Sequence, residues 1–396
     1  MSATPQWLVP ASVDELAGLL RTATHDRTPV KIAGRSPTVI DSSASALHDA
    51  RVRLVSLERL PLAIDHAAGD LIATIPAGTC LEDANDALRH GGQWLALDPY
   101  DRDLTVGAVI ATNASGPRRH RFGTPRDLII GIEIALADGR LVRAGGRVVK
   151  NVAGYDLSRM MCGARGSLGV VTSATFKLTP LAQASATVVV ETADAAAACA
   201  LARAIDETAV SPSAVELQGP KWTLLVRFES TATATAQQAH AVADLARRAG
   251  AAPVILTGGR ESDAWEAAAR ELRTPGATLL KASVRPSDVH DFLVHIADGA
   301  RTARVAWQMS ARVLLGVLEI ELRGDRAEHS SFRDLTSRIR QWAEGRNGSA
   351  IVEKTTIELG IDRWGEVGNA LPLMRAVKAQ FDPAGILNPG GGPGGL

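Results

Sequence analysis

Small residues gather in two segments of the sequence, and each segment can bring the backbone close to a ligand. TVGAVIATNASG runs from Thr105 to Gly116, and CGARGSLGVVT runs from Cys162 to Thr172. The first segment contains neither the G-x-G-x-x-G of a dinucleotide-binding turn nor the G-x-x-x-x-G-K-[ST] of a P-loop. Small side chains allow backbone N–H groups to approach a flat ligand or a phosphate, but they also allow two elements to pack tightly. The residue chemistry alone leaves both interpretations open.

A cluster of basic residues follows the first small-residue segment. It contains Arg118, Arg119, His120, Arg121 and Arg126. The planar guanidinium group suits a carboxylate or a phosphate, so this cluster can contact an acidic substrate or a cofactor. A solvated loop or a protein-contact surface is the alternative, and most charged clusters are solvated.

The composition excludes several classes of protein. The 43 Lys and Arg residues balance 43 Asp and Glu residues, so no global basic field exists to hold nucleic acid. Cys80, Cys162 and Cys199 have no C-x-x-C spacing, and His290 and His295 do not share a helix face, so we predict no metal site. The N-terminus does not resemble a signal peptide, and the most apolar later segment is too short to cross a bilayer. We expect no direct membrane insertion and a cytoplasmic protein that reaches the inner membrane only through a partner.

Short strands alternate with capped helices before Pro180. Ser12 and Glu15 have the spacing of a capping box, and so do Thr79 and Glu82, so each pair predicts the start of a helix. Alternating apolar residues around Asp138-Gly139 predict a β-hairpin. The strands expected on either side of these features are TPVKIAG (28–34), LIATIPAG (71–78) and GVVTSATFKL (169–178).

The pattern changes after Pro180. From 187 to 256 the predicted order is β-α-β-β-α-β, which is the ferredoxin-like order, and the same order recurs from 278 to 354. No repeat of individual residues accompanies this similarity of order. Two such units side by side predict one antiparallel sheet with helices on one face, and hence an α+β fold.

Three separated segments resemble the flavin-binding domain of the vanillyl-alcohol oxidase family, also called the PCMH type. They are AGTCLEDANDALRHGGQWLALDP, TVGAVIATNASG with the following GTPRDLIIGIEIALADG, and GGRVVKNVAGYDLSRMMCGARGSLGVVTSATFKLTP. The ending KAQFDPAGILNPG resembles the C-terminal motif of the branch that oxidises D-2-hydroxy acids. Within that branch, NASGPRRHRFGTPRD and VVKNVAGYDLSRMMCG look most like the FAD-binding E subunits of bacterial glycolate oxidases.

This resemblance implies a division of the chain into four parts. Residues 1–180 form a two-subdomain PCMH-type FAD-binding domain, and residues 181–355 form a cap domain with an antiparallel sheet that covers the flavin. Residues 356–390 return to the FAD domain, and residues 391–396 form a disordered tail.

The resemblance also assigns residues to the cofactor. The first pyrophosphate loop falls on 33–38, and TVGAVIATNASG adds contacts to the pyrophosphate and the ring. Gly163, Gly166, Gly169 and Val171 line the adenosine and ribityl side, and Asn388 returns to the ring. The full set is Gly34, Arg35, Ser36, Thr38, Pro99, Thr105, Gly107, Ala108, Asn113, Ala114, Gly116, Gly163, Gly166, Gly169, Val171 and Asn388.

The sequence departs from the family pattern at three places. The first loop reads AGRSPT, in which Pro37 has no N–H to donate and Arg35 adds a charge that can pair with the pyrophosphate. Ala108 stands where the family has a second glycine. No histidine stands in the first loop, so we expect noncovalent FAD, and none stands in EKTTIELGIDRWGEVGNALPLMR, where catalytic relatives carry a His-Gly motif. The catalytic residues are therefore unknown.

Three functions are compatible with these features. The first is an FAD-binding subunit of a glycolate oxidase-like complex, which oxidises a small 2-hydroxy acid with a catalytic flavin subunit and an iron–sulfur subunit as partners. The second is a self-sufficient FAD-dependent oxidase or dehydrogenase of another small hydroxy acid or alcohol, with a base from the cap domain. The third is a structural or assembly protein that has lost the flavin, which the AGRSPT loop motivates.

Overall fold

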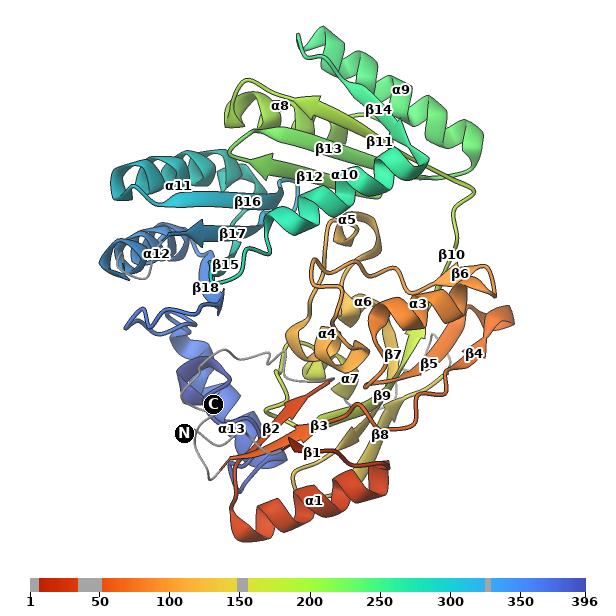
Figure 1. The fold of residues 1–396 in the computed structure, drawn as a ribbon, viewed down its shortest axis with the longest axis vertical. Helices are drawn as coiled ribbons and strands as arrows, with labels where there is room; N and C mark the ends of the chain where they lie inside the picture. The colour runs from red at the N-terminus through yellow and green to blue at the C-terminus, as the bar shows by residue number, and fades with distance from the viewer. Residues whose placement is uncertain (1–6, 35–51, 148–155, 325–328) are drawn as a thin grey trace. The chain divides into compact units, whose positions relative to one another are not determined.

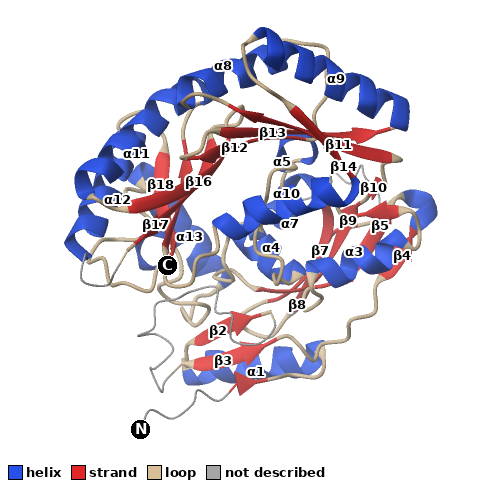
Figure 2. Cartoon of the chain, turned by 45° about the horizontal axis from the view of Figure 1, so that its top comes forward, coloured by secondary structure: helices blue, strands red, loops and turns tan. Residues whose placement is uncertain are grey.

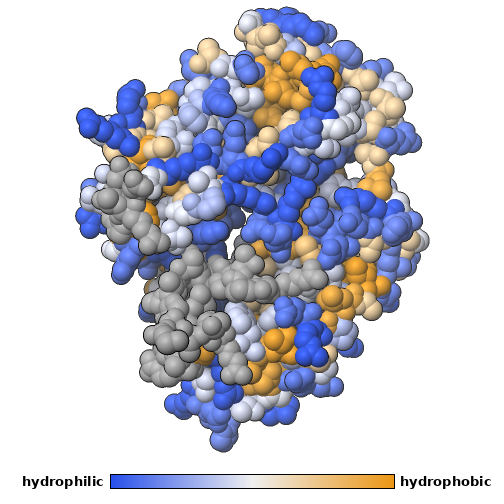
Figure 3. Space-filling view, in the orientation of Figure 1, coloured by the Kyte–Doolittle hydropathy of each residue, from blue (hydrophilic) through white to orange (hydrophobic). Residues whose placement is uncertain are grey.

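The computed structural model describes residues 7–34, 52–147, 156–324 and 329–396, and the chain forms two compact units (Figure 1). Unit 1 comprises Met1–Gly116, Phe122–Leu181 and Val367–Leu396, and unit 2 comprises Pro117–Arg121 and Ala182–Glu366. Hydrophilic residues predominate on the face drawn in Figure 3, where hydrophobic residues form separate patches. None of the described helices is both long enough and apolar enough to cross a membrane.

Unit 1 begins with a small parallel sheet in the order β1-β3-β2. Its strands are β1 (Trp7–Leu8), β2 (Val30–Ala33) and β3 (Arg53–Ser56). Helix α1 (Val13–Asp26) starts as the sequence predicts, because the Ser12 hydroxyl accepts a hydrogen bond from the backbone N–H of Glu15 at 3.1 Å. The apolar residues of α1 are spaced three or four apart, and Leu16, Leu20 and Ala23 are all fully buried.

A five-stranded antiparallel sheet forms the rest of the core of unit 1. Its order is β4-β5-β9-β7-β8, with β4 (Asp65–Ala67), β5 (Ile72–Pro76), β7 (Ile129–Ala135), β8 (Leu141–Gly145) and β9 (Val170–Lys177). The β7–β8 hairpin turns at Asp138 and Gly139, whose φ of 79° suits glycine, so this prediction is confirmed. The remaining elements are β6 (Gln93–Trp94), β10 (Thr179–Pro180), α3 (Leu81–Arg89), α4 (Val106–Thr112), α6 (Pro125–Leu128), α7 (Leu157–Met161) and α13 (Leu371–Phe381), while α5 (Arg119–Phe122) crosses the boundary between the units.

The second predicted capping box is wrong. Helix α3 begins at Leu81 with Cys80 as its N-cap, and no side chain caps it. The hydroxyl of Thr79 is buried and has no hydrogen-bond partner among the described residues. The main chain explains the difference, because the Thr79 carbonyl accepts from Val106 N at 2.9 Å and its N–H donates to Pro76 O at 3.1 Å. Thr79 therefore belongs to the turn between β5 and α3, which is hydrogen-bonded to the start of α4, rather than to the helix start.

Unit 2 consists of two β-α-β-β-α-β repeats that share one antiparallel sheet (Figure 2). The strand order, β14-β11-β13-β12-β16-β17-β15-β18, places the two repeats on either side of the β12–β16 pair. This confirms the α+β fold. The first repeat contains β11 (Ala184–Glu191), α8 (Ala195–Asp206), β12 (Ala214–Gly219), β13 (Thr223–Ser230), α9 (Ala232–Arg248) and β14 (Val254–Thr257). The second contains β15 (Thr278–Ser283), α11 (Val289–Ala303), β16 (Ala306–Arg312), β17 (Val317–Arg323), α12 (His329–Glu344) and β18 (Ser349–Lys354).

The two faces of this sheet differ in chemistry. Figure 2 shows α8, α9, α11 and α12 along one face, where Val188, Leu217 and Leu318 join the hydrophobic core. Helix α10 (Gly258–Glu271) lies against the other face, where Glu261 accepts hydrogen bonds from two β11 hydroxyls. Because side chains alternate along a strand, the polar residues of each strand point to the face that lacks the four long helices.

The C-terminal segment packs into unit 1 beside the N-terminal strands (Figure 1). Leu387 forms a parallel bridge with Val30, and the Asn388 N–H donates to Val30 O at 2.8 Å. The tail 391–396, expected to be disordered, instead folds back through the turn η5 (Pro393–Gly395), and Gly391 and Gly392 are buried. Glycine permits this fold, since a Cβ at Gly391 would lie 2.2 Å from the Asn388 Nδ2 atom.

Candidate functional site

Unit 1 contains a pocket that both small-residue segments line, and the empty space in it and in the solvent at its mouth is about 580 Å³. Helix α4 and the residue before it form one wall, and the chain from Ala164 to Val171 forms another. Eight of the residues expected to bind the cofactor line this pocket: Gly34, Thr105, Gly107, Ala108, Gly166, Gly169, Val171 and Asn388.

Other expected residues lie elsewhere. Arg35, Ser36 and Thr38 fall outside the described residues. Pro99, Asn113, Ala114, Gly116 and Gly163 are described but do not line the pocket. The pocket adds residues that sequence reasoning missed: Ile32, Leu57, Ala111, Met161, Ala164, Arg165 and Val170. Ala111 and Ala164 lie inside the small-residue segments, so the sequence offers a signal that could have indicated them as pocket residues. Ile32, Leu57 and Met161 have no such signal, because in the sequence they resemble ordinary core residues.

Glycines bring α4 close to its neighbours. A Cβ at Gly107 would lie 2.9 Å from the Cβ of Ala77, and a Cβ at Gly34 would lie 2.1 Å from Thr105 Oγ1. Thr105 caps α4, since its hydroxyl accepts from Ala108 N at 3.3 Å. These glycines therefore serve tight packing, and the packing in turn sets the position of the α4 wall.

The second wall combines packing and open backbone. Gly169 is packed, because a Cβ there would lie 2.5 Å from Ile134 Cγ2, whereas Gly166 has a φ of 72° and nothing within 4 Å of its Cβ position. Two hydrogen bonds join this wall to α4: Gly163 N donates to Ile110 O at 2.9 Å, and Arg165 N donates to Ala111 O at 2.8 Å. Gly169 therefore serves packing, whereas Gly166 leaves its backbone open.

The C-terminal segment supports the second wall through a partly buried lysine. The Lys378 ammonium donates to Ser167 O at 2.8 Å, to Leu387 O at 2.8 Å and to Asp382 Oδ2 at 2.7 Å. Asp382 is only 2% exposed and also accepts from the backbone of residues 386 and 387. Asn388 Nδ2 donates to Arg165 O at 2.6 Å. This set of bonds fixes the wall relative to the chain end.

Two buried polar atoms after α4 lack partners. Asn113 adopts a left-handed conformation with φ of 49° and ends α4, while its Oδ1 has no hydrogen-bond partner in the described part of the chain. Ser115 is 4% exposed, and its Oγ is likewise unpaired there. Buried polar atoms are almost always hydrogen-bonded, so these two indicate an unfilled contact.

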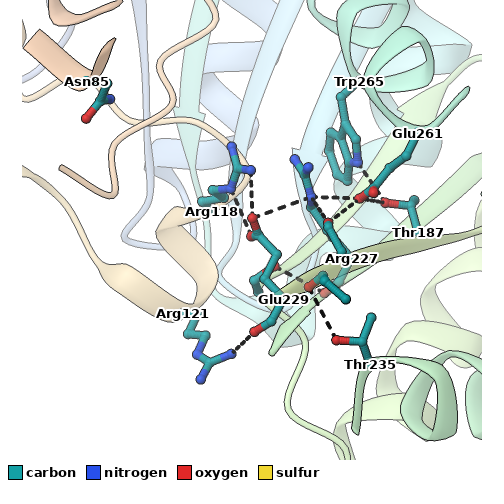
Figure 4. Close-up of polar contacts among 12 residues, drawn as sticks. Asn85, Arg118, Arg121, Thr187, Arg227, Glu229, Thr235, Glu261 and Trp265 are labelled. Carbon is teal, nitrogen blue, oxygen red and sulfur yellow. Dashed lines mark hydrogen bonds and ion pairs between the residues drawn. The ribbon is translucent and has the colours of Figure 1, made fainter. Parts of the chain in front are cut away.

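Part of the basic cluster forms an ion pair within unit 2 (Figure 4). Arg118 donates from Nε and Nη2 to the two Glu229 carboxylate oxygens at 2.9 and 2.8 Å, and Arg121 donates to the Glu229 carbonyl at 3.1 Å. Burial would raise the pKa of Glu229, but the hydrogen bonds and charge of Arg118, followed by the charge of Arg227, outweigh it and lower the pKa to about 2. Arg118 is thus neither solvated nor aimed at an acidic ligand, because Glu229 occupies its guanidinium fork.

The same network continues across the polar face of the sheet. Arg227 Nε lies 2.9 Å from Glu261 Oε1, which also accepts from Ser185 and Thr187 hydroxyls at 2.7 and 2.8 Å. Trp265 Nε1 donates to the Thr187 hydroxyl at 2.8 Å (Figure 4). This face therefore pairs opposite charges and supplies each carboxylate with several donors.

Histidine and cysteine add little nucleophilic chemistry. Burial lowers the pKa of His120, with the charge of Asp206 opposing the shift, so the imidazole is neutral at pH 7. Burial raises the pKa of the Cys162 thiol to about 12, and all three cysteines are free. No group of three metal-binding side chains occurs in the described ranges.

Comparison with known proteins connects this pocket to flavin chemistry. A model described as an FAD binding domain matches residues 5–145, and one described as the C-terminal domain of FAD linked oxidases matches residues 364–391. The glycolate oxidase subunit GlcD of Bacillus subtilis is 28% identical over 98% of this chain and 90% of its own length.

Two further relatives match only parts. The glycolate oxidase subunit GlcE of Escherichia coli is 40% identical over 31% of this chain and 35% of its own length. A D-lactate dehydrogenase of Archaeoglobus fulgidus is 34% identical over 43% of this chain and 38% of its own length. A solved alkyldihydroxyacetonephosphate synthase has a TM-score of 0.74 over 97% of this chain and 76% of its own, and at 15% identity it shows the shared fold.

The match to an FAD binding domain over residues 5–145 and the relatives support one class, the PCMH-type FAD flavoproteins, and the solved structure shows the shared fold. Within that class it is an FAD-linked oxidoreductase related to glycolate oxidase and D-lactate dehydrogenase.

The residues of the pocket fit FAD. The cofactor needs flat apolar surface for its rings and polar contacts for its pyrophosphate and ring edge. Val171 and Met161 supply apolar surface, and Gly166 leaves open space above its backbone. Thr105, Arg165 and Asn388 supply polar groups in the lining.

Proposed function

We propose that this chain is the FAD-binding subunit of a glycolate oxidase-like complex that oxidises glycolate, or a closely related 2-hydroxy acid, and passes electrons onward. The observation that carries the proposal is the pocket of unit 1, in which both small-residue segments and Asn388 meet. The relatives named as glycolate oxidase subunits support the substrate class and the role as a subunit.

Bound FAD would accept the hydride equivalent from the carbinol carbon of the hydroxy acid. The chain's own residues bind and orient that group. Thr105, Ala108 and the backbone at Gly166 would contact the cofactor, and Lys378 would keep the second wall in place. We expect noncovalent binding, because the described lining of the pocket contains no histidine or cysteine.

The partners would be a catalytic flavin subunit and an iron–sulfur subunit. The sequence has no cluster motif of its own to carry single electrons. Helix α13 offers one surface for a partner, since Leu373 is 69% exposed and Met374 is 39% exposed. Through such a partner the chain would associate with the inner membrane from the cytoplasm.

The test is purification from the native host, followed by a visible spectrum and identification of the chains that co-purify. The proposal expects flavin absorbance, two partner chains and glycolate turnover that is much faster in the complex than in the isolated chain. Equal turnover by the isolated chain would contradict the subunit role, and protein that takes up no added FAD would contradict the cofactor.

A self-sufficient hydroxy acid oxidase is the second candidate. The match to GlcD over 98% of the chain favours it, because that match includes unit 2 as well as unit 1. The half-buried, neutral His120 of unit 2 has the protonation state that a general base requires. Steady-state assays of the isolated chain with a dye acceptor and a panel of hydroxy acids decide between the two candidates, with His120→Gln as the diagnostic variant.

A further inference from the structure

Residues 386–388 connect two parts of unit 1 that line its pocket. On one side, Val30 N donates to Ile386 O and Asn388 N donates to Val30 O, both at 2.8 Å. On the other side, Asn388 Nδ2 donates to Arg165 O at 2.6 Å. Strand β2, which begins at Val30, contributes to the pocket lining, and so do Arg165 and Asn388 themselves. This short stretch therefore joins β2 to the second wall of the pocket.

An ion pair with little solvent exposure holds this stretch in its turn. Asp382 Oδ1 accepts a hydrogen bond from Ile386 N at 3.1 Å. Its Oδ2 accepts from Leu387 N and from the Lys378 ammonium, each at 2.7 Å. The Lys378 and Asp382 side chains are 12% and 0% exposed. A carboxylate that accepts from a cation and from two backbone N–H groups makes strong hydrogen bonds, so Asp382 fixes the backbone of the residues that follow it.

The ammonium of Lys378 extends this attachment to the second wall. An ammonium group has three donors, and Asp382 takes one of them. The other two go to Leu387 O and Ser167 O, each at 2.8 Å. The ion pair thus holds Leu387 by both its N–H and its carbonyl, and holds the second wall by the carbonyl of Ser167.

Gly166 lies between two carbonyls that these contacts anchor. Asn388 donates to the carbonyl of Arg165, and Lys378 donates to that of Ser167. Gly166 lines the pocket, and nothing lies within 4 Å of its Cβ position. Because glycine has no side chain to fix its own backbone, the position of this part of the wall depends on the anchors at its two neighbours.

We propose that Lys378 and Asp382 are positioning residues for the cofactor. By holding residues 386–388 against both β2 and the second wall, they set the separation of two sides of the FAD pocket. Neither residue belongs to the described lining, so both act through Asn388 and the backbone around Gly166. This inference rests on the proposed function in one respect, namely that the occupant of the pocket is FAD. Because such coupling is reciprocal, bound FAD also stabilises the attachment of residues 386–388.

An ion pair that only stabilised unit 1 would behave differently. Its loss would lower the free energy of unfolding and would leave the folded pocket unchanged. Leu20→Ala provides this comparison, because it removes a fully buried side chain of α1 that does not line the pocket. Arg375→Met provides a second comparison, because it removes a positive charge from an exposed position of α13, the helix that carries Lys378.

The experiment uses the full chain as wild type, as Lys378→Met, as Asp382→Asn and as the two comparison variants. Titration measures the dissociation constant of FAD. Hydrogen exchange of the Arg165 and Ser167 amides is measured without cofactor. These amides donate to the carbonyls of residues 111 and 164, which no substitution removes, so their exchange reports the conformation of the wall.

We expect faster exchange at both wall amides in Lys378→Met and Asp382→Asn, together with an FAD dissociation constant raised about tenfold. Leu20→Ala should be less stable than the wild type, but its wall amides and FAD affinity should match those of the wild type. Arg375→Met should match the wild type in all three measurements. Dissociation constants and wall exchange rates in Lys378→Met and Asp382→Asn that match those of the comparison variants would overturn the inference.

The wild-type chain supplies a further measurement in case these variants fold poorly. The Leu387 amide donates to Asp382, and the Asn388 amide donates to Val30. Added FAD should slow hydrogen exchange at both amides, and unchanged exchange with FAD bound would contradict the proposed coupling. If the wild-type chain bound no FAD, the proposed function would fail, while the exchange of the wall amides would still decide whether the ion pair positions the wall.

Discussion

The pocket wall of unit 1 and the polar face of the unit 2 sheet use polar groups in opposite ways. Many side chains that line the pocket are small, and Gly166 leaves open space; just after α4, Asn113 Oδ1 and Ser115 Oγ have no partner in the described chain. On the sheet, Arg118 and Arg227 are paired with Glu229 and Glu261 at distances of 2.8–2.9 Å.

This difference shows that the clustered charged residues of the chain are not the ones that form its pocket. The basic cluster after Gly116 is the more conspicuous feature of the sequence, yet the partner of Arg118 lies within the protein itself. The neutral small-residue segments are less conspicuous, and they retain the unpaired polar atoms and the open backbone. Small side chains and the open backbone at Gly166, rather than charges, characterise the pocket.

The largest effect is expected from a methyl group placed where unit 1 is most tightly packed. Gly116→Ala would put a Cβ 1.7 Å from the backbone oxygen of Asp98, which cannot rotate away. We expect the free energy of unfolding to fall by more than about 3 kcal/mol, as in severe overpacking. Urea denaturation of the purified variant measures this loss.

Gly166→Ala is the matched comparison, because its Cβ would meet nothing within 4 Å. The positive φ of 72° costs about 1–2 kcal/mol with a side chain present. The new methyl group would instead enter the pocket, so we expect weaker FAD binding with a modest loss of stability. Equal losses of stability in the two variants would contradict the distinction between packed and open glycines in unit 1.

The next largest effect concerns the charge pairs of unit 2. The pKa of Glu229 lies near 2 in the folded chain, against an ordinary value of 4.5. Because the folded pKa is the lower one, the stabilisation is complete well above pH 4.5 and is lost as the pH falls toward 2. Between about pH 5 and about pH 3 this amounts to about 2 kcal/mol.

Glu229→Gln isolates that contribution from the other carboxylates. Urea midpoints of the wild type and the variant, measured across this pH range, should converge as the pH falls. Parallel curves would show that Glu229 titrates normally, and the description of the sheet face as internally paired would then be wrong.

The architecture could be predicted because it depends on local patterns. Hydrophobic alternation, the Asp138-Gly139 turn and the Ser12 cap each act within a few residues, and all three appear as expected. The order of the elements alone predicts the two β-α-β-β-α-β repeats. Short connections and a shared hydrophobic face are enough to bring their strands into one sheet.

The site could be predicted only in part, because it depends on contacts between distant segments. The small-residue motifs indicate Gly166 and Thr105, but no local signal reveals that Lys378 supports the wall at Ser167. Spacing also cannot tell whether an arginine has an internal partner, and Glu229 lies more than a hundred positions after Arg118 in the sequence. The predicted disorder of the glycine tail is wrong, because composition does not show that Gly391 packs against Asn388.

The smallest effect tests the helix cap beside the pocket. Thr105 and Thr79 both precede a helix in the sequence, but only the Thr105 hydroxyl accepts a hydrogen bond from its helix, from Ala108 N at 3.3 Å. Thr105→Ala should therefore lower the free energy of unfolding by about 1 kcal/mol, whereas Thr79→Ala should change it by less than about 0.5 kcal/mol. Thermal denaturation of the two variants side by side measures the difference. If Thr79→Ala proved the more damaging, Thr79 rather than Thr105 would cap its helix, and the α4 wall of the pocket would lack the anchor described for it.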